Sequence, residues 1–526
     1  MTLLQWFIFF LVVQVVHFAG TWKLYVKAGR KPWEAIVPVY NAVVLMQIIG
    51  RPRWWVILLF IPIVNLIMFP VIWVETLRSF GKNTTTDTVL GIVTLGIYIY
   101  YINYTQDVKH IPERDLKAKS KSGDTVSSLL YAIIVATLVH TYVLQPFTIP
   151  TPSLEKTLLV GDFLFVSKLN YGARTPMTAV AAPMVHDSLP ILNVKSYLNW
   201  PQIPYFRLPG YEKVSKNDIV VFNWPIDTVH YFGDRKTVGL RKPIDKKSNY
   251  VKRCVGAPGD TFSMKDGVVY INSKVMEVND RARLQHWYDV TTTDGGMLDP
   301  NYLVNDLQIN PRDIGYDEAN KMYIFRSLTE ENAVKMKSNS RIKSIERRIF
   351  KDNTMFAAEE QTRIFPHNQP GWTVDNIGDI YIPQEGKTVT LNAQTLPFYK
   401  MVIAEYEKND LKVNGDEIRI NGQVATSYTF KQNYYWMMGD NRNNSEDSRY
   451  WGFVPEDHIV GKPVFIWLSV DQNETWGHIG KKIRWERMFT TVGGSGEPVS
   501  YFKYFLGLLV AWFVFDFFRK KRKTAA

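Results

Sequence analysis

The sequence has almost no cysteine, because Cys254 stands alone among 526 residues. A single cysteine excludes an intramolecular disulfide and a cysteine-based zinc cluster, so the fold must depend on packing. The turn-rich, acidic segment 439–461 lacks the regular spacing of a calcium loop. We therefore expect neither a metal nor another cofactor. No internal repeat and no low-complexity tract is apparent, so a repeat architecture is not indicated.

Acidic residues are fewer than basic ones, 50 against 62, and the formal net charge is +12. Such an excess is compatible with nucleic-acid binding, but its position argues against that. Basic clusters at 23–31, 109–121 and 519–523 lie beside apolar runs. Basic residues that flank hydrophobic spans mark the cytoplasmic side of a membrane. We therefore expect a membrane protein with no nucleic-acid partner.

Several apolar runs approach the length of about 20 residues that a membrane span needs. They are Leu3–Ala19, Trp54–Trp73, Val89–Tyr104, Val126–Leu144 and Tyr504–Phe518. The first run has no basic start and no cleavage-like site, so a signal peptide is the weaker interpretation. The run Ala35–Ile49 contains Pro38 and Asn41, which favours an interfacial or re-entrant segment.

The charge asymmetry predicts one topology. The span after the basic cluster 109–121 leaves the cytoplasm, and the last span returns. This gives an N-terminal multi-span region at 1–125, a transmembrane helix at 126–145, an exported domain at 146–500 and a C-terminal helix with a cytoplasmic tail at 501–526.

The exported region reads as mainly β, because short runs of β-branched and aromatic residues end at Gly, Asn, Asp or Pro. The runs are Phe163–Val166, Ile219–Phe222, Val268–Ile271, Ile418–Ile420, Tyr434–Met438 and Val464–Trp467. Asn421-Gly422 indicates a two-residue hairpin. Residues of about 283–400 are more polar and irregular, and we expect an inserted subdomain there. The predicted fold is thus a mainly β domain with an insertion and helical membrane segments at both ends.

Three segments of this region carry chemistry-bearing side chains. Ser153 lies in PFTIPTPSLEK after the fourth apolar run, where a serine is by itself most often a helix cap. Lys252 lies in YVKRCVGAPGD, where a lysine is by itself most often a surface residue. The third segment, GDNRNNSEDSRYWGFVP from Gly439 to Pro455, is dense in turn formers and carboxylates.

In this order behind an apolar run, the three segments resemble bacterial type I signal peptidase, a Ser–Lys serine endopeptidase. The resemblance also covers GDFLFVSKLNYG at 161–172 and most of the exported region. It implies an enzyme of the bacterial inner membrane that faces the extracytoplasmic side. Such an enzyme removes signal peptides from exported pre-proteins after small residues. Its implied partners are those pre-proteins, the lipid bilayer and the secretion machinery.

The family's residue roles are implied for the matching positions. Ser153 matches the acylated nucleophile and Lys252 the general base. Thr151 matches the residue whose hydroxyl completes the oxyanion hole with the main-chain N–H of Ser153. The remaining matches are Asp447, Ser445 and Arg449, which order the site, and Phe147, Ile149, Pro150, Leu158, Tyr250 and Val251, which line the substrate pockets.

The chain departs from the family at two positions near the nucleophile. Pro152 stands where glycine is common, and Lys156 replaces a usual proline. Glycine and proline occupy different backbone regions, so Pro152 places the local loop geometry in question. The extra N-terminal spans have no assigned role in the family.

The chemistry demands a neutral lysine, because only the free amine can take a proton from the serine hydroxyl. Burial against Tyr250 and Val251 is expected to lower the lysine pKa toward a working range of about 7–8. Asp447 must then act at a distance, through Ser445 or Arg449, since direct pairing would raise that pKa. A catalytic thiol at Cys254 is a weaker alternative.

Two other functions compete with the main prediction: a related processing protease with narrower targets, and an inactive membrane scaffold. The intact Ser153, Lys252 and Asp447 argue against the scaffold. We expect most of the aromatic residues at 434–436, and Trp451, to lie in the core, with lipid contact as the alternative.

Overall fold

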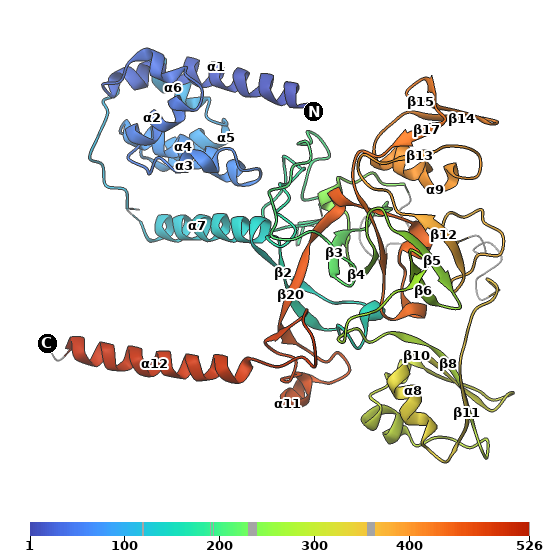
Figure 1. The fold of residues 1–526 in the computed structure, drawn as a ribbon. Helices are drawn as coiled ribbons and strands as arrows, with labels where there is room; N and C mark the ends of the chain where they lie inside the picture. The colour runs from blue at the N-terminus through green and yellow to red at the C-terminus, as the bar shows by residue number, and fades with distance from the viewer. Residues whose placement is uncertain (118–119, 190, 193, 230–238, 355–362, 525–526) are drawn as a thin grey trace. The chain divides into compact units, whose positions relative to one another are not determined.

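In the described residues as far as Tyr142 the regular elements are helices, whereas strands begin with β1 at Leu144 and alternate with short helices after it (Figure 1). The computed structural model describes residues 1–117, 120–189, 191–192, 194–229, 239–354 and 363–524. These residues form two units. The first, called the helical unit, comprises residues 1–143, 173–208 and 228–247; the second, called the β unit, comprises residues 144–172, 209–227 and 248–526.

Most of the helical unit is built from apolar helices. Their bounds are α1 Leu3–Lys27, α2 Tyr40–Ile48, α3 Trp55–Leu58, α4 Val64–Ser79, α5 Thr85–Val93, α6 Tyr98–Thr105 and α7 Lys121–Tyr142, with a 3-10 turn at Pro32–Ala35. Their core includes Leu24, Val44 and Ile102, all buried. Thr2 caps α1 by accepting a hydrogen bond from the N–H of Gln5.

Two helices of the described residues, α1 and α7, are long and apolar enough to cross a membrane. They agree with the first and fourth predicted spans. The predicted run Val89–Tyr104 falls on α5 and α6, and the chain bends by 117° between these two helices. The pair is a third candidate span if both helices belong to one broken span.

The single kinked span predicted at Trp54–Trp73 is wrong, because α3 ends at Leu58 and α4 begins at Val64. Pro62 has no N–H to continue a helix. The backbone at Ile63 is left-handed, with φ 70°, which separates the two helices. Pro70 then lies inside α4.

Two helices of the helical unit begin with a similar short segment. Segments 38–41 and 62–65 both read Pro, a β-branched residue, any residue, Asn. Val39 has φ 66° and ψ −47° at the start of α2, and Ile63 has φ 70° and ψ −47° at the start of α4. A β-branched residue at positive φ is rare. The two helices α2 and α4 therefore begin with the same local turn.

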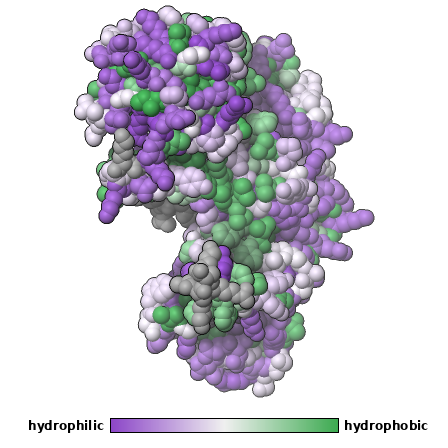
Figure 2. Space-filling view, turned by 90° about the vertical axis from the view of Figure 1, so that its left-hand side faces the viewer, coloured by the Kyte–Doolittle hydropathy of each residue, from purple (hydrophilic) through white to green (hydrophobic). Residues whose placement is uncertain are grey.

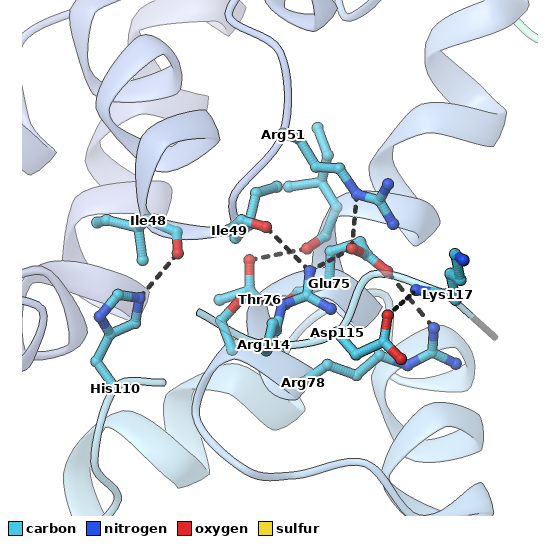
Figure 3. A network of polar contacts seen from close by, with 12 residues as sticks. Ile48, Ile49, Arg51, Glu75, Thr76, Arg78, His110, Arg114, Asp115 and Lys117 are labelled. Carbon is cyan, nitrogen blue, oxygen red and sulfur yellow. Dashed lines mark hydrogen bonds and ion pairs between the residues drawn. The ribbon is translucent and has the colours of Figure 1, made fainter. Parts of the chain in front are cut away.

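A buried carboxylate at the end of α4 pairs with three arginines of the helical unit (Figure 3). Glu75 lies 2.9 Å from Arg51 and 3.5 Å from Arg78, and it also pairs with Arg114. Arg114 donates a further hydrogen bond to Ser79 at 3.0 Å. The polar groups at this end of the unit are thus joined in one network.

The main sheet of the β unit has eight strands in the described part of the chain, with all recorded pairs antiparallel. The order is β1-β2-β20-β3-β4-β18-β19, with β21 beside β20. Their bounds are β1 Leu144–Thr148, β2 Asp162–Ser167, β3 Ile219–Asn223, β4 Asn249–Gly256, β18 Tyr434–Met438, β19 Val454–Pro455, β20 Ile459–Ser469 and β21 Thr490–Thr491.

Smaller sheets follow in the middle of the chain. They are β12-β5-β6-β7, β11-β8-β10-β9, β13-β17 and β14-β15-β16. The strands are β5 Thr261–Lys265, β6 Val268–Ile271, β7 Lys274–Val275, β8 Gln285–Thr292, β9 Ile314–Asp317, β10 Met322–Thr329, β11 Ile342–Arg347, β12 Ile377–Tyr381, β13 Thr388–Thr390, β14 Leu411–Asn414, β15 Glu417–Ile420, β16 Gln423–Val424 and β17 Ser427–Thr429.

The prediction of a mainly β domain is confirmed, and each of the six predicted strand runs lies in a strand. Asn421 and Gly422 form the predicted hairpin turn, with φ 52° and 83° between paired Ile420 and Gln423. The sheet with β8 to β11 has its own core, which includes Val290, Phe325 and Met336. An inserted subdomain at about 283–400 stays a prediction.

The β unit has short helices at α8 Glu330–Lys337, α9 Leu396–Met401, α10 Ser448–Trp451 and α11 Ile479–Lys482. A longer helix, α12 Phe502–Thr524, follows near the C-terminus. The predicted run Tyr504–Phe518 lies within α12, where Asp516 pairs with Arg519 and Lys520. The aromatic residues at 434–436 and Trp451 are buried. These aromatics are core, and the alternative of lipid contact for them is wrong.

Candidate active site

The main sheet places the predicted nucleophile on a turn directly after its first strand. Following β1, residues Pro152–Leu154 form a 3-10 turn that contains Ser153. The carbonyl of Ser153 accepts a hydrogen bond from the N–H of Asn441 at 3.0 Å. The side chain of Asn441 also donates to the carbonyl of Pro152 at 3.1 Å. The third sequence segment therefore fixes the backbone of the first.

The predicted base comes from a central strand of the same sheet. Lys252 lies on β4, where it is paired with Val220 on β3. Its Nζ is 2.6 Å from the Oγ of Ser153, and both residues are buried, with exposed fractions of 3% and 7%. Two residues 99 positions apart are thus brought into hydrogen-bond contact.

The surroundings of Lys252 favour its neutral form. Burial lowers the pKa of the amine to about 8, against the opposing charge of Asp447. The ring of Tyr250 lies 5.4 Å from Nζ. In the part of the chain that the structure describes, no carboxylate lies within ion-pair distance of this lysine. Its amine is therefore available to exchange a proton near neutral pH.

Asp447 pairs with Arg449 and not with the lysine. The Nε of Arg449 donates to the carboxylate at 2.8 Å and the guanidinium NH2 donates at 2.9 Å, with both side chains fully buried. Burial alone would raise the pKa of Asp447, but the Arg449 guanidinium holds it below its usual range. Asp447 also accepts from the N–H of Gly439 at 3.1 Å. This geometry agrees with action at a distance through Arg449.

A second buried ion pair supports the site, and the sequence reasoning missed it. Arg253, next to the lysine, donates to Asp440 at 2.7 and 2.6 Å. Thr157 donates to the same carboxylate at 2.7 Å and accepts from the N–H of Arg283 at 3.1 Å. Both members of the pair lie inside the sequence segments already singled out, so their adjacency to Lys252 and Asp447 was the available signal.

Gly439 is a further residue that the sequence reasoning missed. A Cβ at this position would lie 2.3 Å from the Oγ of Ser445 and 2.5 Å from the carbonyl oxygen of Ser153. Only glycine leaves room for this approach without moving the nucleophile. The Oγ of Ser445 is itself buried and has no hydrogen-bond partner among the described residues.

The other predicted site residues lie around the same turn. Thr151 is partly buried directly before the turn, and its hydroxyl makes no hydrogen bond with the residues the structure describes. Ile149 and Leu158 are buried in one apolar cluster, against which Val251 packs. Phe147 packs on a neighbouring cluster, Tyr250 belongs to a third, and Pro150 is exposed.

The two departures from the family have local explanations. Pro152 occupies the first position of the 3-10 turn, where the fixed φ of proline suits a helical start. Lys156 has φ 66°, which proline cannot adopt. Its Nζ donates to the carbonyl of Gln308, in the segment between β8 and β9. The nucleophile turn is thereby attached to the sheet that contains β8.

Cys254 is buried on β4, and burial raises the pKa of its thiol. Its Sγ lies 3.5 Å from the carbonyl of Gly256. A thiol with a raised pKa is a poor nucleophile, so these contacts disfavour the thiol alternative. Within the described ranges, no three His, Cys, Asp or Glu side chains gather in a way that could hold a metal ion.

Comparison with known proteins identifies the family of most of the chain. The family model "Signal peptidase, peptidase S26" matches residues 122–335 and 378–468, which together exceed half of the chain. Residues 33–113 match a separate family of unknown function, DUF5684.

Three relatives named signal peptidase I illustrate the similarity. The protein of Buchnera aphidicola subsp. Baizongia pistaciae is 25% identical over 366 residues, covering 69% of this chain and 83% of the relative. That of Haemophilus influenzae is 24% identical over 385 residues, covering 71% and 76%. That of Helicobacter pylori strain J99 is 28% identical over 387 residues, covering 71% and 94%. The chain therefore belongs to the signal peptidase family, peptidase S26.

Proposed function

We propose that Ser153 and Lys252 perform the reaction of this signal peptidase, the removal of signal peptides from exported pre-proteins. The family membership makes the chain a serine endopeptidase of this class. The observation that carries the residue assignment is the 2.6 Å contact between Nζ and Oγ, in a setting that lowers the lysine pKa to about 8.

The first half of the reaction follows from this contact. The neutral amine of Lys252 takes the hydroxyl proton while the Oγ of Ser153 attacks the scissile carbonyl carbon. The carbonyl oxygen becomes an oxyanion, which the N–H of Ser153 and the hydroxyl of Thr151 stabilise. Thr151 suits this role because its hydroxyl makes no hydrogen bond with the described residues.

The second half releases the products. The ammonium of Lys252 gives its proton to the leaving amine, and the C–N bond breaks to leave an ester on Ser153. Lys252 then takes a proton from water, whose oxygen attacks the ester carbonyl carbon. The bond between this carbon and Oγ breaks, Lys252 returns the proton to the Oγ of Ser153, and the signal peptide leaves with a free carboxylate. The pockets that accept small residues are assigned to Phe147, Ile149, Pro150, Leu158, Tyr250 and Val251.

The membrane arrangement belongs to the same proposal. We assign α1, α7 and the C-terminal α12 as spans, with the β unit on the extracytoplasmic side. Basic groups support this orientation: Lys27, at the end of α1, and Lys82 bind the main-chain and side-chain oxygens of Gln106 at 2.8 and 3.3 Å. Over the helical unit, the upper part of the view in Figure 2 is mostly hydrophilic. Such an end suits the cytoplasmic surface.

Cleavage of a purified pre-protein tests the function. Full-length wild type, Ser153→Ala and Lys252→Ala are compared in detergent, with Cys254→Ser as a matched control on the same strand. We expect cleavage by wild type and by the control, and none above background by the other two variants. Undiminished cleavage by either alanine variant would remove that residue from the dyad.

A further inference from the structure

The connection between β2 and β3 forms a structure that the catalytic chemistry does not use. The described residues of 173–208, which are 173–189, 191–192 and 194–208, fold back on themselves as an irregular hairpin within the helical unit (Figure 1). Antiparallel bridges join its two sides: Arg174 with Arg207, Thr178 with Gln202, Ala181 with Tyr197 and Ser188 with Lys195. We call residues 173–208 the hairpin arm.

Asp245 and Lys246, which lie outside the hairpin arm, hold one side of it by hydrogen bonds. Asp245 accepts hydrogen bonds from the N–H groups of Met177 and Thr178 at 3.0 and 2.9 Å, and from the Thr178 hydroxyl at 2.6 Å. Thr178 is completely buried. Lys246 donates to the carbonyl of Val185 at 3.1 Å. These bonds fix the first side of the arm between Met177 and Val185, from which the exposed residues continue.

The outer surface of the hairpin arm is apolar. Ile191 is 98% exposed and Trp200 is 69% exposed. The other large apolar side chains exposed on the arm are Met184, Leu192, Val194, Leu198, Tyr205, Phe206 and Leu208. Single apolar residues are common on protein surfaces, but a series on one ordered element marks a contact surface.

The hairpin arm is attached to the start of a candidate membrane span. The carbonyl of Gln202 accepts from the N-terminal amine of Met1 at 3.2 Å and from the indole N–H of Trp6 at 3.0 Å. Leu3 and Leu4, beside these donors, are 76% and 67% exposed. Because a span ends at the lipid–water interface, Gln202 lies at that level, and Trp200 is two residues away.

The polar groups near the tip also suit a lipid surface. Lys195 is exposed, donates to Asn199 at 2.7 Å, and lies 4.4 Å from the ring of Tyr197. A cation beside aromatic and aliphatic side chains matches the arrangement in which headgroup phosphates lie above the acyl chains.

We propose that the hairpin arm inserts its exposed apolar side chains into the bilayer interface at which α1 begins. The inference rests on the proposed membrane position of α1. The bonds from Gln202 to α1 favour lipid over a protein partner, because they place the arm where lipid is already the neighbour. In this arrangement the hairpin arm holds the connection between β2 and β3 at the level of the lipid–water interface.

Fluorescence labelling tests this contact directly. The variants Ile191→Cys and Trp200→Cys of the full chain are labelled with an NBD fluorophore in vesicles of phosphatidylcholine and phosphatidylglycerol. Lys274→Cys, at an exposed position of β7, is the matched control, and the buried Cys254 of wild type gives the labelling blank. We expect blue-shifted emission and quenching by doxyl lipids at both arm positions, and quenching by aqueous iodide at the control. Iodide quenching at 191 and 200 equal to the control overturns the proposal.

A charge variant separates this proposal from the proposed function. Ile191→Glu, Leu192→Glu and Leu198→Glu are combined, and cleavage of a pre-protein in vesicles is compared with cleavage of a short soluble peptide. We expect the vesicle rate to fall by roughly tenfold, since even partial loss of apolar burial is worth that much. The peptide rate stays unchanged. Equal vesicle rates refute the arm's role, whereas wild type inactive on both substrates refutes the function and leaves the labelling result standing.

Discussion

The two units bury carboxylates against arginines in the same way, but they treat their cations differently. In the helical unit, Glu75 pairs with all three arginines around it. In the β unit, Asp447 holds Arg449 and Asp440 holds Arg253, while Lys252 contacts Ser153. Among the described residues, Lys252 has no carboxylate partner. The comparison shows that the buried arginines are held by carboxylates, whereas burial of Lys252 without such a partner lowers the pKa of its amine.

Replacing the lysine of the site by arginine is expected to have the largest effect on cleavage. Lys252→Arg places a permanently charged group beside Ser153, and a guanidinium cannot act as a base. We expect cleavage to fall by about a thousandfold or more. The counterpart Arg51→Lys keeps a cation beside Glu75 and should leave cleavage of a soluble peptide unchanged. A Lys252→Arg variant with substantial activity would break the comparison, and steady-state cleavage rates decide it.

The side-chain hydroxyl groups of the two units also differ in whether they have a hydrogen-bond partner. Thr76 and Ser79 in the helical unit donate to the carbonyls of Ile72 and Glu75, both at 2.8 Å. The Thr151 hydroxyl makes no such bond with the described residues and is free for an oxyanion. We expect Thr151→Val to lower kcat by about a hundred- to a thousandfold with an unchanged melting temperature. Thr151→Ser should retain most activity, and a mild effect of valine would exclude the role.

Neutralising the buried carboxylate is expected to cost more stability in the β unit than in the helical unit, because the arginines differ in solvent exposure. Asp447→Asn leaves the fully buried Arg449 unpaired, which should cost about 3–5 kcal/mol of stability. Glu75→Gln should cost less, because Arg51, Arg78 and Arg114 keep side-chain exposures of 22%, 42% and 11% and retain contact with water. Thermal unfolding of the full-length variants in detergent measures both. Equal losses would show that burial does not distinguish the networks.

The smallest expected effect is a gradual change of the cleavage rate with pH. With the pKa of Lys252 at about 8, only the neutral fraction reacts, so kcat/KM on a peptide should rise about tenfold per pH unit up to pH 8 and then level. The sign for stability is also defined. Below that pKa the folded state carries a disfavoured charge, and this cost disappears as pH rises toward the ordinary lysine value of 10.5. A rate that is flat between pH 6 and 8 contradicts the assignment.

The sequence predicted the elements that have strong local signals. The strand runs, the Asn421-Gly422 hairpin and the helices α1 and α7 follow from periodicity, turn chemistry and apolar length. It did not predict the break at Ile63, because the left-handed conformation of a β-branched residue has no signal in composition.

In the candidate site, too, local motifs predicted some residues, whereas others became evident only from the folded structure. Ser153 and Lys252 were found through motifs, and their contact agrees with that prediction. The pairing of Arg253 with Asp440 depends on how β4 and the loop after β18 meet, 187 residues apart, which no local pattern encodes. Gly439 was overlooked for the same reason, since only the packed structure shows what lies against it.

The left-handed backbone at Lys156 has a consequence for protein engineering. A consensus design that copies the family would restore proline at this position as a stabilising change. Here proline would be incompatible with a φ of 66° and would also remove the bond to Gln308. The value of a residue depends on its neighbours, so Lys156 and the segment that receives it have to be exchanged together. Retaining Lys156 keeps both the left-handed turn after the nucleophile and its bond to the segment between β8 and β9.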